Sequence, residues 1–334
     1  MAPTGRAYRA AADVLAGVAG VLAVGAAVQA VQTGRDRRRY PPPGRLVDLG
    51  GYRLHLDIRG PADRAEGPTV VLEAGMGSFS ANWYWVQHEL ARTMRVVAYD
   101  RAGLGWSDRG TVPRDADSIA RELHAALYAA GVEGPYLLAG HSFGGLPVRA
   151  FAALFPDETA GVVLVDASHP DQWVRWPVRR ADRMIATSQR VSAVLARVGL
   201  FRLVDVSRQI SAGLPERQVG ELRARSALPG ASAVEAQQMV AWPLSRAQLT
   251  AGLGDLPLVV LGVTDQPRGA ETLTALQAEL PALSTNSARV IVQDATHESL
   301  VAGQEHAMVV ADAIRAVAEG EPQRILGRPG TAPP

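Results

Sequence analysis

Short apolar runs alternate with amphipathic segments over most of the chain. The runs are rich in valine and leucine and are apolar at nearly every position, as in strands that are covered on both faces. Between the runs lie helical patterns, clearest over residues 118–128, where Ile119, Leu123 and Leu127 share one face. The runs span residues 46–49, 52–58, 69–73, 95–99, 136–139, 161–165, 258–262 and 289–293. This alternation predicts an α/β fold with a mostly parallel sheet flanked by helices.

One long interruption divides this pattern. After the run that ends at Val165, residues 169–253 are helix-prone, rich in arginine and interspersed with tryptophan. The strand pattern resumes only after this segment. We therefore expect a core formed by residues 41–168 and 254–319, with a helical cap at 169–253 inserted after the sixth strand and lying over the carboxyl ends of the strands.

The two ends of the chain differ from the core. Residues 14–31 are almost wholly Ala, Val, Gly and Leu, broken only by Gln29, and arginines flank them on both sides. Such a length just spans a bilayer, so residues 1–40 are predicted to be a single-pass anchor in the cell membrane, with its orientation left open. The alternative is a secretory signal peptide, with 28–30 as its small-residue cleavage site and a secreted product. The proline-containing tail, residues 320–334, is predicted to be disordered.

Composition restricts the partners and the chemistry. With 34 Lys and Arg against 33 Asp and Glu, the formal net charge is only +1, and no basic stripe runs along the chain. Nucleic-acid binding is therefore not expected. The chain contains no cysteine, which excludes disulfides, thiolate catalysis and cysteine-ligated metal sites. No metal or organic cofactor is implied.

The strongest local motif is Gly140-His141-Ser142-Phe143-Gly144, which follows the apolar run 136–139 directly. Glycines two positions before and two positions after a serine allow the sharp strand-to-helix turn known as a nucleophile elbow. The helix that follows directs its amino terminus at Ser142, so the N–H of Phe143 can face developing negative charge. This motif makes Ser142 the candidate nucleophile.

A serine nucleophile needs a base, and the base needs an acidic partner that fixes its tautomer. Of seven histidines, His297 has the best position, because it follows the last predicted strand at the carboxyl edge of the sheet. Two aspartates compete as the acid. Asp265 follows the strand just before that of His297 and completes the order Ser, Asp, His, whereas Asp166 ends the sixth strand at the same edge. Asp265 is favoured and Asp166 is the alternative.

Two further groups complete the predicted site. A glycine-rich loop after the strand 69–73 offers the N–H of Met76 as the second oxyanion donor, beside that of Phe143. Aromatic and methionine side chains gather in the loops and the cap and suggest an apolar substrate pocket, although each alone is more often a packing residue. The pocket candidates are Phe79, Trp106, His169, Trp173, Trp176, Met239 and Trp242.

With these residues in place, the chain resembles the α/β-hydrolase superfamily over residues 46–168 and 254–319. The resemblance rests on the elbow at 140–145 and on the turn 99–108, which reads Tyr-Asp-Arg-Ala-Gly-Leu-Gly-Trp-Ser-Asp. It also rests on the positions of Asp265 and His297, where the family places its acid and base. Within the superfamily the chain is similar to a bacterial group of membrane-anchored hydrolases. One departure is Ala74-Gly75, where the family usually has His-Gly in the oxyanion loop.

The resemblance implies a reaction class. Relatives that open epoxides or displace halide use an aspartate at the elbow, so Ser142 argues for acyl transfer instead. The expected activity is hydrolysis of carboxylic esters of small to medium apolar substrates through an acyl-enzyme. A serine hydrolase of amide or C–C bonds, or a cofactor-free perhydrolase, would carry the same motifs, and a ligand-binding module on this fold is the non-enzyme alternative. The oligomeric state stays open.

Overall fold

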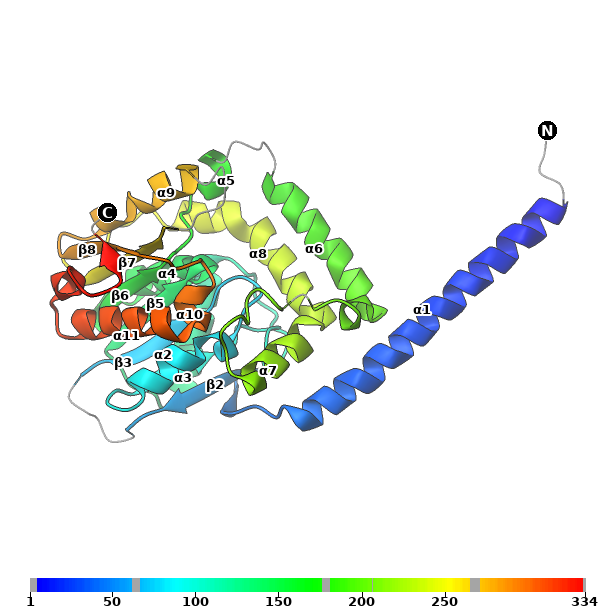
Figure 1. Ribbon diagram of the computed structural model, residues 1–334, viewed down its shortest axis with the longest axis horizontal. Helices are drawn as coiled ribbons and strands as arrows, with labels where there is room; N and C mark the ends of the chain where they lie inside the picture. Colours follow the sequence, from blue (N-terminus) through cyan, green and yellow to red (C-terminus); the bar gives the residue numbers. More distant parts are fainter. Residues whose placement is uncertain (1–4, 62–66, 176–180, 206, 265–270, 333–334) are drawn as a thin grey trace.

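The computed structural model describes residues 5–61, 67–175, 181–205, 207–264 and 271–332. In this part of the chain a nine-stranded sheet has the order β1-β2-β4-β3-β5-β6-β7-β8-β9. Strands β3 to β8 run parallel to one another, whereas β1, β2 and β9 pair antiparallel at the two edges (Figure 1). The strands are β1 (Arg45–Asp48), β2 (Arg53–Arg59), β3 (Thr69–Glu73), β4 (Val96–Tyr99), β5 (Tyr136–His141), β6 (Thr159–Val165), β7 (Leu258–Val263), β8 (Ser287–Val292) and β9 (Thr331–Ala332). The predicted mostly parallel sheet is confirmed.

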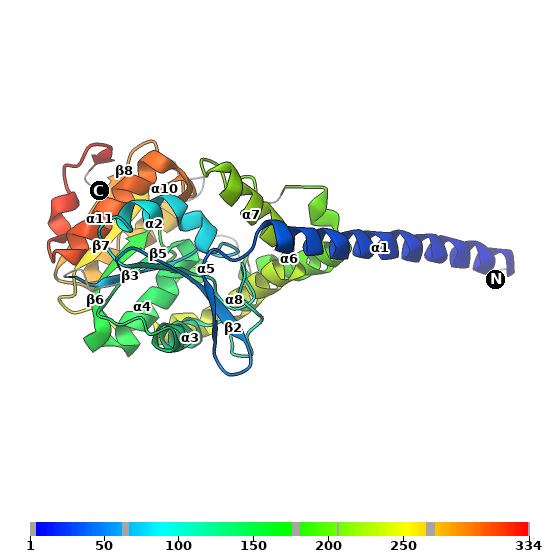
Figure 2. The ribbon, with the colours of Figure 1, turned by 90° about the horizontal axis from the view of Figure 1, so that it is seen from below.

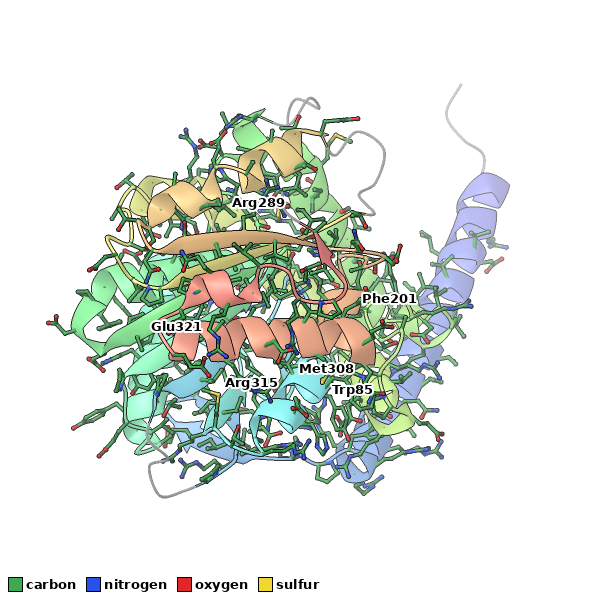
Figure 3. The ribbon with its side chains drawn as sticks, turned by 60° about the vertical axis from the view of Figure 1, so that its left-hand side comes forward. Trp85, Phe201, Arg289, Met308, Arg315 and Glu321 are labelled. Carbon is green, nitrogen blue, oxygen red and sulfur yellow. The ribbon has the colours of Figure 1, made fainter. Side chains whose placement is uncertain are left out.

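Helices cover both faces of the sheet. One apolar core contains the inward faces of α3 and α4, and the other contains those of α2 and α11. Met308 of α11 lies near Trp85 of α2 in Figure 3, and further along α11 Arg315 Nη2 binds Glu89 Oε1 of α2 at 2.7 Å. The helices are α1 (Gly5–Arg39), α2 (Tyr84–Leu90), α3 (Ala116–Ala129), α4 (Gly145–Leu154), α5 (Gln172–Arg175), α6 (Ala181–Arg197), α7 (Glu216–Ser226), α8 (Pro229–Gln248), α9 (Glu271–Gln277), α10 (Ser299–Ala302) and α11 (Gln304–Ala318). The short 3₁₀ helices are η1 (Ser80–Trp83), η2 (Ser142–Gly144), η3 (Pro156–Glu158), η4 (Leu200–Arg202), η5 (Leu280–Leu283) and η6 (Pro322–Ile325).

The helical insertion comes where the sequence places it. Helices α5, α6, α7 and α8 lie between β6 and β7 in the chain, within the predicted cap range 169–253. Helices α6, α7 and α8 gather on one side of the sheet, as Figure 1 shows. The inserted helices are fixed to the core by apolar contacts, since Met239 and Trp242 of α8 are buried in the same cluster as α3 and α4.

The carboxyl-terminal tail departs from the prediction of disorder. Residues Pro322–Ile325 form η6, and β9 pairs antiparallel with β8, with Thr331 opposite Val292. The physical reason is Ile325, which is only 1% exposed and packs in the core beside α11. The proline content of the tail suggested disorder, but one buried aliphatic side chain and an open sheet edge hold the tail against the domain.

The first helix extends away from the domain. Helix α1 is long and apolar enough to cross a membrane over Ala12–Arg39, and its apolar side chains are largely exposed. Only its carboxyl-terminal part approaches the cap, and the rest stands clear of the molecule (Figures 1 and 2).

Candidate active site

Ser142 occupies a sharp turn between β5 and α4. Its φ of 54° lies in the left-handed region, which a non-glycine residue adopts only where the surroundings enforce it. The turn is crowded: a Cβ on Gly140 would lie 2.5 Å from the carbonyl oxygen of Gly144, and a Cβ on Gly144 would lie 2.5 Å from that of Glu73. The glycines are therefore sterically required, as the elbow motif predicts.

Asp166 lies beside Ser142 because β5 and β6 are adjacent and parallel. Val165 pairs with His141 in the register, so the next residue on each strand comes out at the same edge. Asp166 also has a positive φ, 42°, and it is 2% exposed. Two residues further on, the N–H of Ser168 donates to the carbonyl oxygen of Ser142 at 2.9 Å. The two strand ends are thereby fixed to each other.

His297 reaches the same edge from the loop after β8. Its Nδ1 lies 2.5 Å from Asp166 Oδ2, while Gln277 Nε2 of α9 donates to Asp166 Oδ1 at 2.9 Å. The carboxylate therefore accepts through both oxygens, and the Nδ1–H of His297 is held in place. This tautomer leaves Nε2 as the free basic nitrogen. Asp265, the acid favoured from sequence, lies outside the described residues.

The electrostatics of His297 are set by two opposing effects. Burial lowers the pKa of the imidazole, but the hydrogen bond and the charge of Asp166, with Glu298 nearby, outweigh burial and raise the pKa above its ordinary value. The carboxylate therefore stabilises the protonated ring. That is the property a base needs while it holds a proton taken from a hydroxyl.

His141, the residue before the nucleophile, has its ring 4.5 Å from that of His297. Its Nε2 donates to the backbone carbonyl of His297 at 2.9 Å. Burial, with the charge of His297, lowers the pKa of His141 to about 3, so the ring stays neutral. His141 thus fastens the loop that carries His297 to the strand that carries Ser142.

The loop predicted to supply the second oxyanion donor lies against Ser142. A Cβ on Gly75 would lie 3.2 Å from the Cβ of Ser142. The fully buried Arg101 holds this loop from behind, because its guanidinium donates to the carbonyls of Ala74 and Gly75, each at 2.5 Å, and pairs with Glu73. With their carbonyls turned towards Arg101, the loop residues can present N–H groups to the other side, where Ser142 lies.

Ser142, Asp166 and His297 line one cavity of about 580 Å³. The other described residues in its wall are mostly polar: Ser168, Gln172, Gln209, Ala212, Leu273, Thr296, Glu298 and Ser299. None of the predicted pocket residues appears among them. The described wall thus combines polar side chains with apolar surface, and the predicted apolar pocket stays a prediction. Among the described residues, no group of three or more His, Asp or Glu side chains is arranged to hold a metal ion.

The predicted pocket residues instead pack among themselves. The ring of Trp242 lies 5.9 Å from that of Phe143 and 5.7 Å from that of Trp173, and Trp242 Nε1 donates to the carbonyl of Pro170 at 2.9 Å. Met239 is buried in the same cluster. The remaining three described candidates are likewise accounted for: Phe79 packs edge-on against Trp106 at 5.5 Å, and His169 Nδ1 accepts from the N–H of Asp171 at 3.1 Å. Trp176 lies outside the described residues.

A family model decides the classification. The model described as the alpha/beta hydrolase fold matches residues 68–301, most of the chain. The chain belongs to this α/β-hydrolase family. Its match includes the elbow, the strand end at Asp166 and the His297 loop.

Relatives agree with this assignment. An AB hydrolase superfamily protein of Gibberella zeae is 39% identical over 113 residues, which are 33% of this chain and 35% of that protein. Cfl2 of Burkholderia cenocepacia has a similar structure, with a TM-score of 0.65 and 22% identity over 82% of this chain and 95% of that one. A thermophilic esterase of Thermogutta terrifontis gives a TM-score of 0.61 and 21% identity over 82% of this chain and 98% of that one. This chain spans 35% of the length of the Gibberella protein, 20% of that of a probable transporter of Hormonema carpetanum and 48% of that of an uncharacterized Bacillus subtilis protein.

In this α/β hydrolase, the contacts of three residues of the site were not predicted from the sequence. Gln277 is an ordinary helix residue, and nothing in its neighbourhood signals that it holds Asp166. Arg101 lies inside the turn motif 99–108. The signal that the sequence offered was a charged residue directly after an apolar strand. His141 belongs to the elbow itself, so its contact with the loop of the base depends on the three-dimensional approach of β5 and the loop after β8.

Proposed function

We propose that this chain is a serine hydrolase of carboxylic esters. In the proposed mechanism the hydroxyl oxygen of Ser142 attacks the ester carbonyl while His297 Nε2 accepts the hydroxyl proton. The backbone N–H groups of Phe143 and Met76 hold the resulting oxyanion. His297 then returns the proton to the departing alcohol. Water, activated by the same imidazole, finally releases the acid and restores Ser142.

Asp166 is proposed as the acid of this triad, in place of Asp265. The observation that carries the proposal is the 2.5 Å contact between His297 Nδ1 and Asp166 Oδ2, in the cavity that Ser142 also lines. A base held in this tautomer presents its other nitrogen to the cavity, and the neighbouring carboxylate favours the protonated ring that forms during attack. The cavity wall offers apolar surface for the apolar groups of an ester and polar side chains for hydrogen bonds near its scissile bond.

A fluorophosphonate probe tests the nucleophile. The full-length protein is expected to be labelled, whereas Ser142→Ala is not; Ser188→Ala, which changes an exposed serine on α6, is the matched control and keeps the label. If the wild-type protein resists the probe, the chain is a binding module on a hydrolase fold.

A panel of short and medium p-nitrophenyl esters tests the bond that is cut. Turnover that disappears in Ser142→Ala supports the ester proposal. Labelling without hydrolysis of any ester would move the assignment to amide or C–C bonds, or to perhydrolysis.

We also propose that α1 anchors the protein in the cell membrane. Its length and composition over Ala12–Arg39 support this location. The mass of the mature protein separates the two sequence-based alternatives: an intact N-terminus in the membrane fraction fits an anchor, while loss of residues 1–30 and release from the cell fits a signal peptide.

A further inference from the structure

The carboxyl-terminal part of α1 is packed against the cap rather than leaving the domain freely. A Cβ on Gly25 would overlap the carbonyl oxygen of Val198, and a Cβ on Gly199 would lie 3.0 Å from the carbonyl oxygen of Gly25. The two backbones therefore approach as closely as glycine permits. In Figure 1 the carboxyl end of α6 meets α1 part-way along the length of α1. The cap therefore contacts the helix that is proposed to span the membrane.

Gln29, the polar residue that interrupts the apolar run, belongs to this contact. It is 6% exposed, and its Nε2 donates to the carbonyl of Ala227 at 3.0 Å. Arg202 Nε donates to Gln29 Oε1 at 2.8 Å, and Arg202 Nη1 pairs with Asp36 Oδ2 at 2.5 Å. A polar group inside a membrane segment must find its partners in the protein, and the cap supplies them here.

The contact also fixes the depth of the cap. The apolar run of α1 ends at Val31. At about 1.5 Å of rise per residue, Gly25 lies about 9 Å inside that end. If α1 spans a hydrocarbon layer of about 30 Å, the cap residues that touch Gly25 share its depth and lie below the membrane surface.

The surface of the cap around this contact suits such a place. We define the cap tip as residues 191–204. On α6 its outward face carries Val191, Val194 and Leu195, while Ala193 and Ala196 face inward and are buried. Beyond the helix, exposed apolar side chains continue at Leu200, Leu203 and Val204. A contiguous exposed apolar face of this kind, on an arginine-containing amphipathic helix, is typical of a segment that lies in the membrane interface.

We propose that the cap tip is inserted into the lipid bilayer that α1 spans. This inference rests on the proposed membrane anchor and adds to it a second point of insertion. Arg190 is exposed on the same helix, where its long stem can carry the guanidinium group up to lipid headgroups, while Arg197 Nη1 donates to the carbonyl of Ala193 at 3.1 Å. The cap of this hydrolase then faces the membrane, and a substrate dissolved in lipid has a short path to the insertion that covers the strand ends.

The chain contains no cysteine, so single cysteines can report depth in the full-length protein. The test uses Leu203→Cys on the cap tip and Tyr128→Cys on α3, two positions that are both 82% exposed. A third variant, Val21→Cys, reports on α1 itself. Each carries an environment-sensitive fluorophore. The proteins are reconstituted in nanodiscs of phosphatidylcholine and phosphatidylglycerol, with or without lipids that bear a nitroxide on the acyl chain.

The expected result is a loss of fluorescence at position 203 that is comparable with the loss at position 21, and no loss at position 128. Quenching at 21 without quenching at 203 would overturn the insertion of the cap tip and leave the anchor intact. No quenching at 21 would instead refute the anchor, and the insertion with it. A label at 203 that is blue-shifted but not quenched would show that a second copy of the protein covers the tip, which also overturns the proposal.

Discussion

Ser142 and Asp166 share an uncommon backbone conformation at the ends of neighbouring strands. Their φ values of 54° and 42° turn the backbone sharply out of the sheet at both strand ends, so that a hydroxyl and a carboxylate emerge at one edge. Such conformations cost of order 1–3 kcal/mol each and persist only where packing enforces them. Here the enforcement includes the required glycines of the elbow and the hydrogen bond from Ser168 to Ser142.

Replacing the acid tests the proposed triad at single-residue resolution. Asp166→Asn is expected to lower kcat/KM for an ester substrate by about 10³–10⁴, because an amide can hold His297 in the wrong tautomer. Asp265→Asn is the matched control and is expected to stay within a few-fold of wild type. Steady-state kinetics of both variants decide the question, and the reverse ranking would restore Asp265 as the acid.

The pH profile gives a second, independent prediction. The proposed mechanism needs neutral His297, and Asp166 raises the pKa of this ring, so wild-type kcat/KM is expected to fall as the pH drops through a pKa above that of an ordinary histidine. In Asp166→Asn the raising effect is lost while burial still lowers the pKa. The residual activity should therefore extend to more acidic pH. An unchanged acid limb would contradict the pairing of Asp166 with His297.

The sequence predicts the nucleophile and the base but does not choose the acid, and the reason is physical. Gly-x-Ser-x-Gly is a steric requirement of one backbone turn, so it can be read without knowledge of the fold. His297 follows from its place after the last parallel strand. The acid could not be chosen this way, because aspartates follow both β6 and β7. The contact of Asp166 depends on a single turn and on Gln277, which arrives from α9.

At the scale of elements, β4 and the loop after β3 are joined by a buried ion pair. Arg101, just beyond β4, lies 1% exposed between Glu73 and the carbonyls of the oxyanion loop. Tyr99 of β4 donates to the other oxygen of Glu73. The loop proposed to hold the oxyanion therefore takes its shape from side chains on the neighbouring strand and its extension.

Breaking this pair is predicted to destabilise the protein through the charge that remains. Arg101→Met should lower the free energy of unfolding by about 3–5 kcal/mol, because Glu73 is left buried without its cation. In Arg101→Met with Glu73→Gln the charge is removed as well, and part of the loss should be recovered. Denaturant unfolding in detergent measures both. A double variant no more stable than Arg101→Met alone would show that the two charges are not coupled.

At the scale of the whole molecule, the carboxyl-terminal segment packs along one edge of the sheet. Strand β9 covers the free edge of β8, and Ile325 fills the core beside α11. The succession of strands, the place of the insertion and the layers of helices follow from periodicity and could be predicted. The tail and the cavity wall could not. A proline-rich segment with one isoleucine shows no helical or strand periodicity. A tryptophan that packs in a core cannot be told from a tryptophan that lines a pocket by its place in the sequence.

Two truncations separate the contributions of the tail. Ending the chain after Gly320 removes the burial of Ile325 and should lower the free energy of unfolding by about 1.5–3 kcal/mol. Ending it after Gly330 removes only the short pairing of β9 and should cost much less. Thermal midpoints of the two proteins make the comparison, and equal midpoints would mean that Ile325 adds nothing to stability.

The way the insertion joins the sheet has an evolutionary consequence. Before the chain departs, Ala167 accepts a hydrogen bond from Gln277 and Ser168 donates one to Ser142; on its return, the N–H of Leu253 donates to the carbonyl of Leu283 at 2.6 Å. Parts of the insertion that do not pack in the core, unlike Met239 and Trp242 of α8, can be lengthened, shortened or exchanged while these hydrogen bonds keep Asp166 in place. Descendants of one ancestor could thus acquire new substrates by swapping a module, and a designer could graft a foreign one between the same joints.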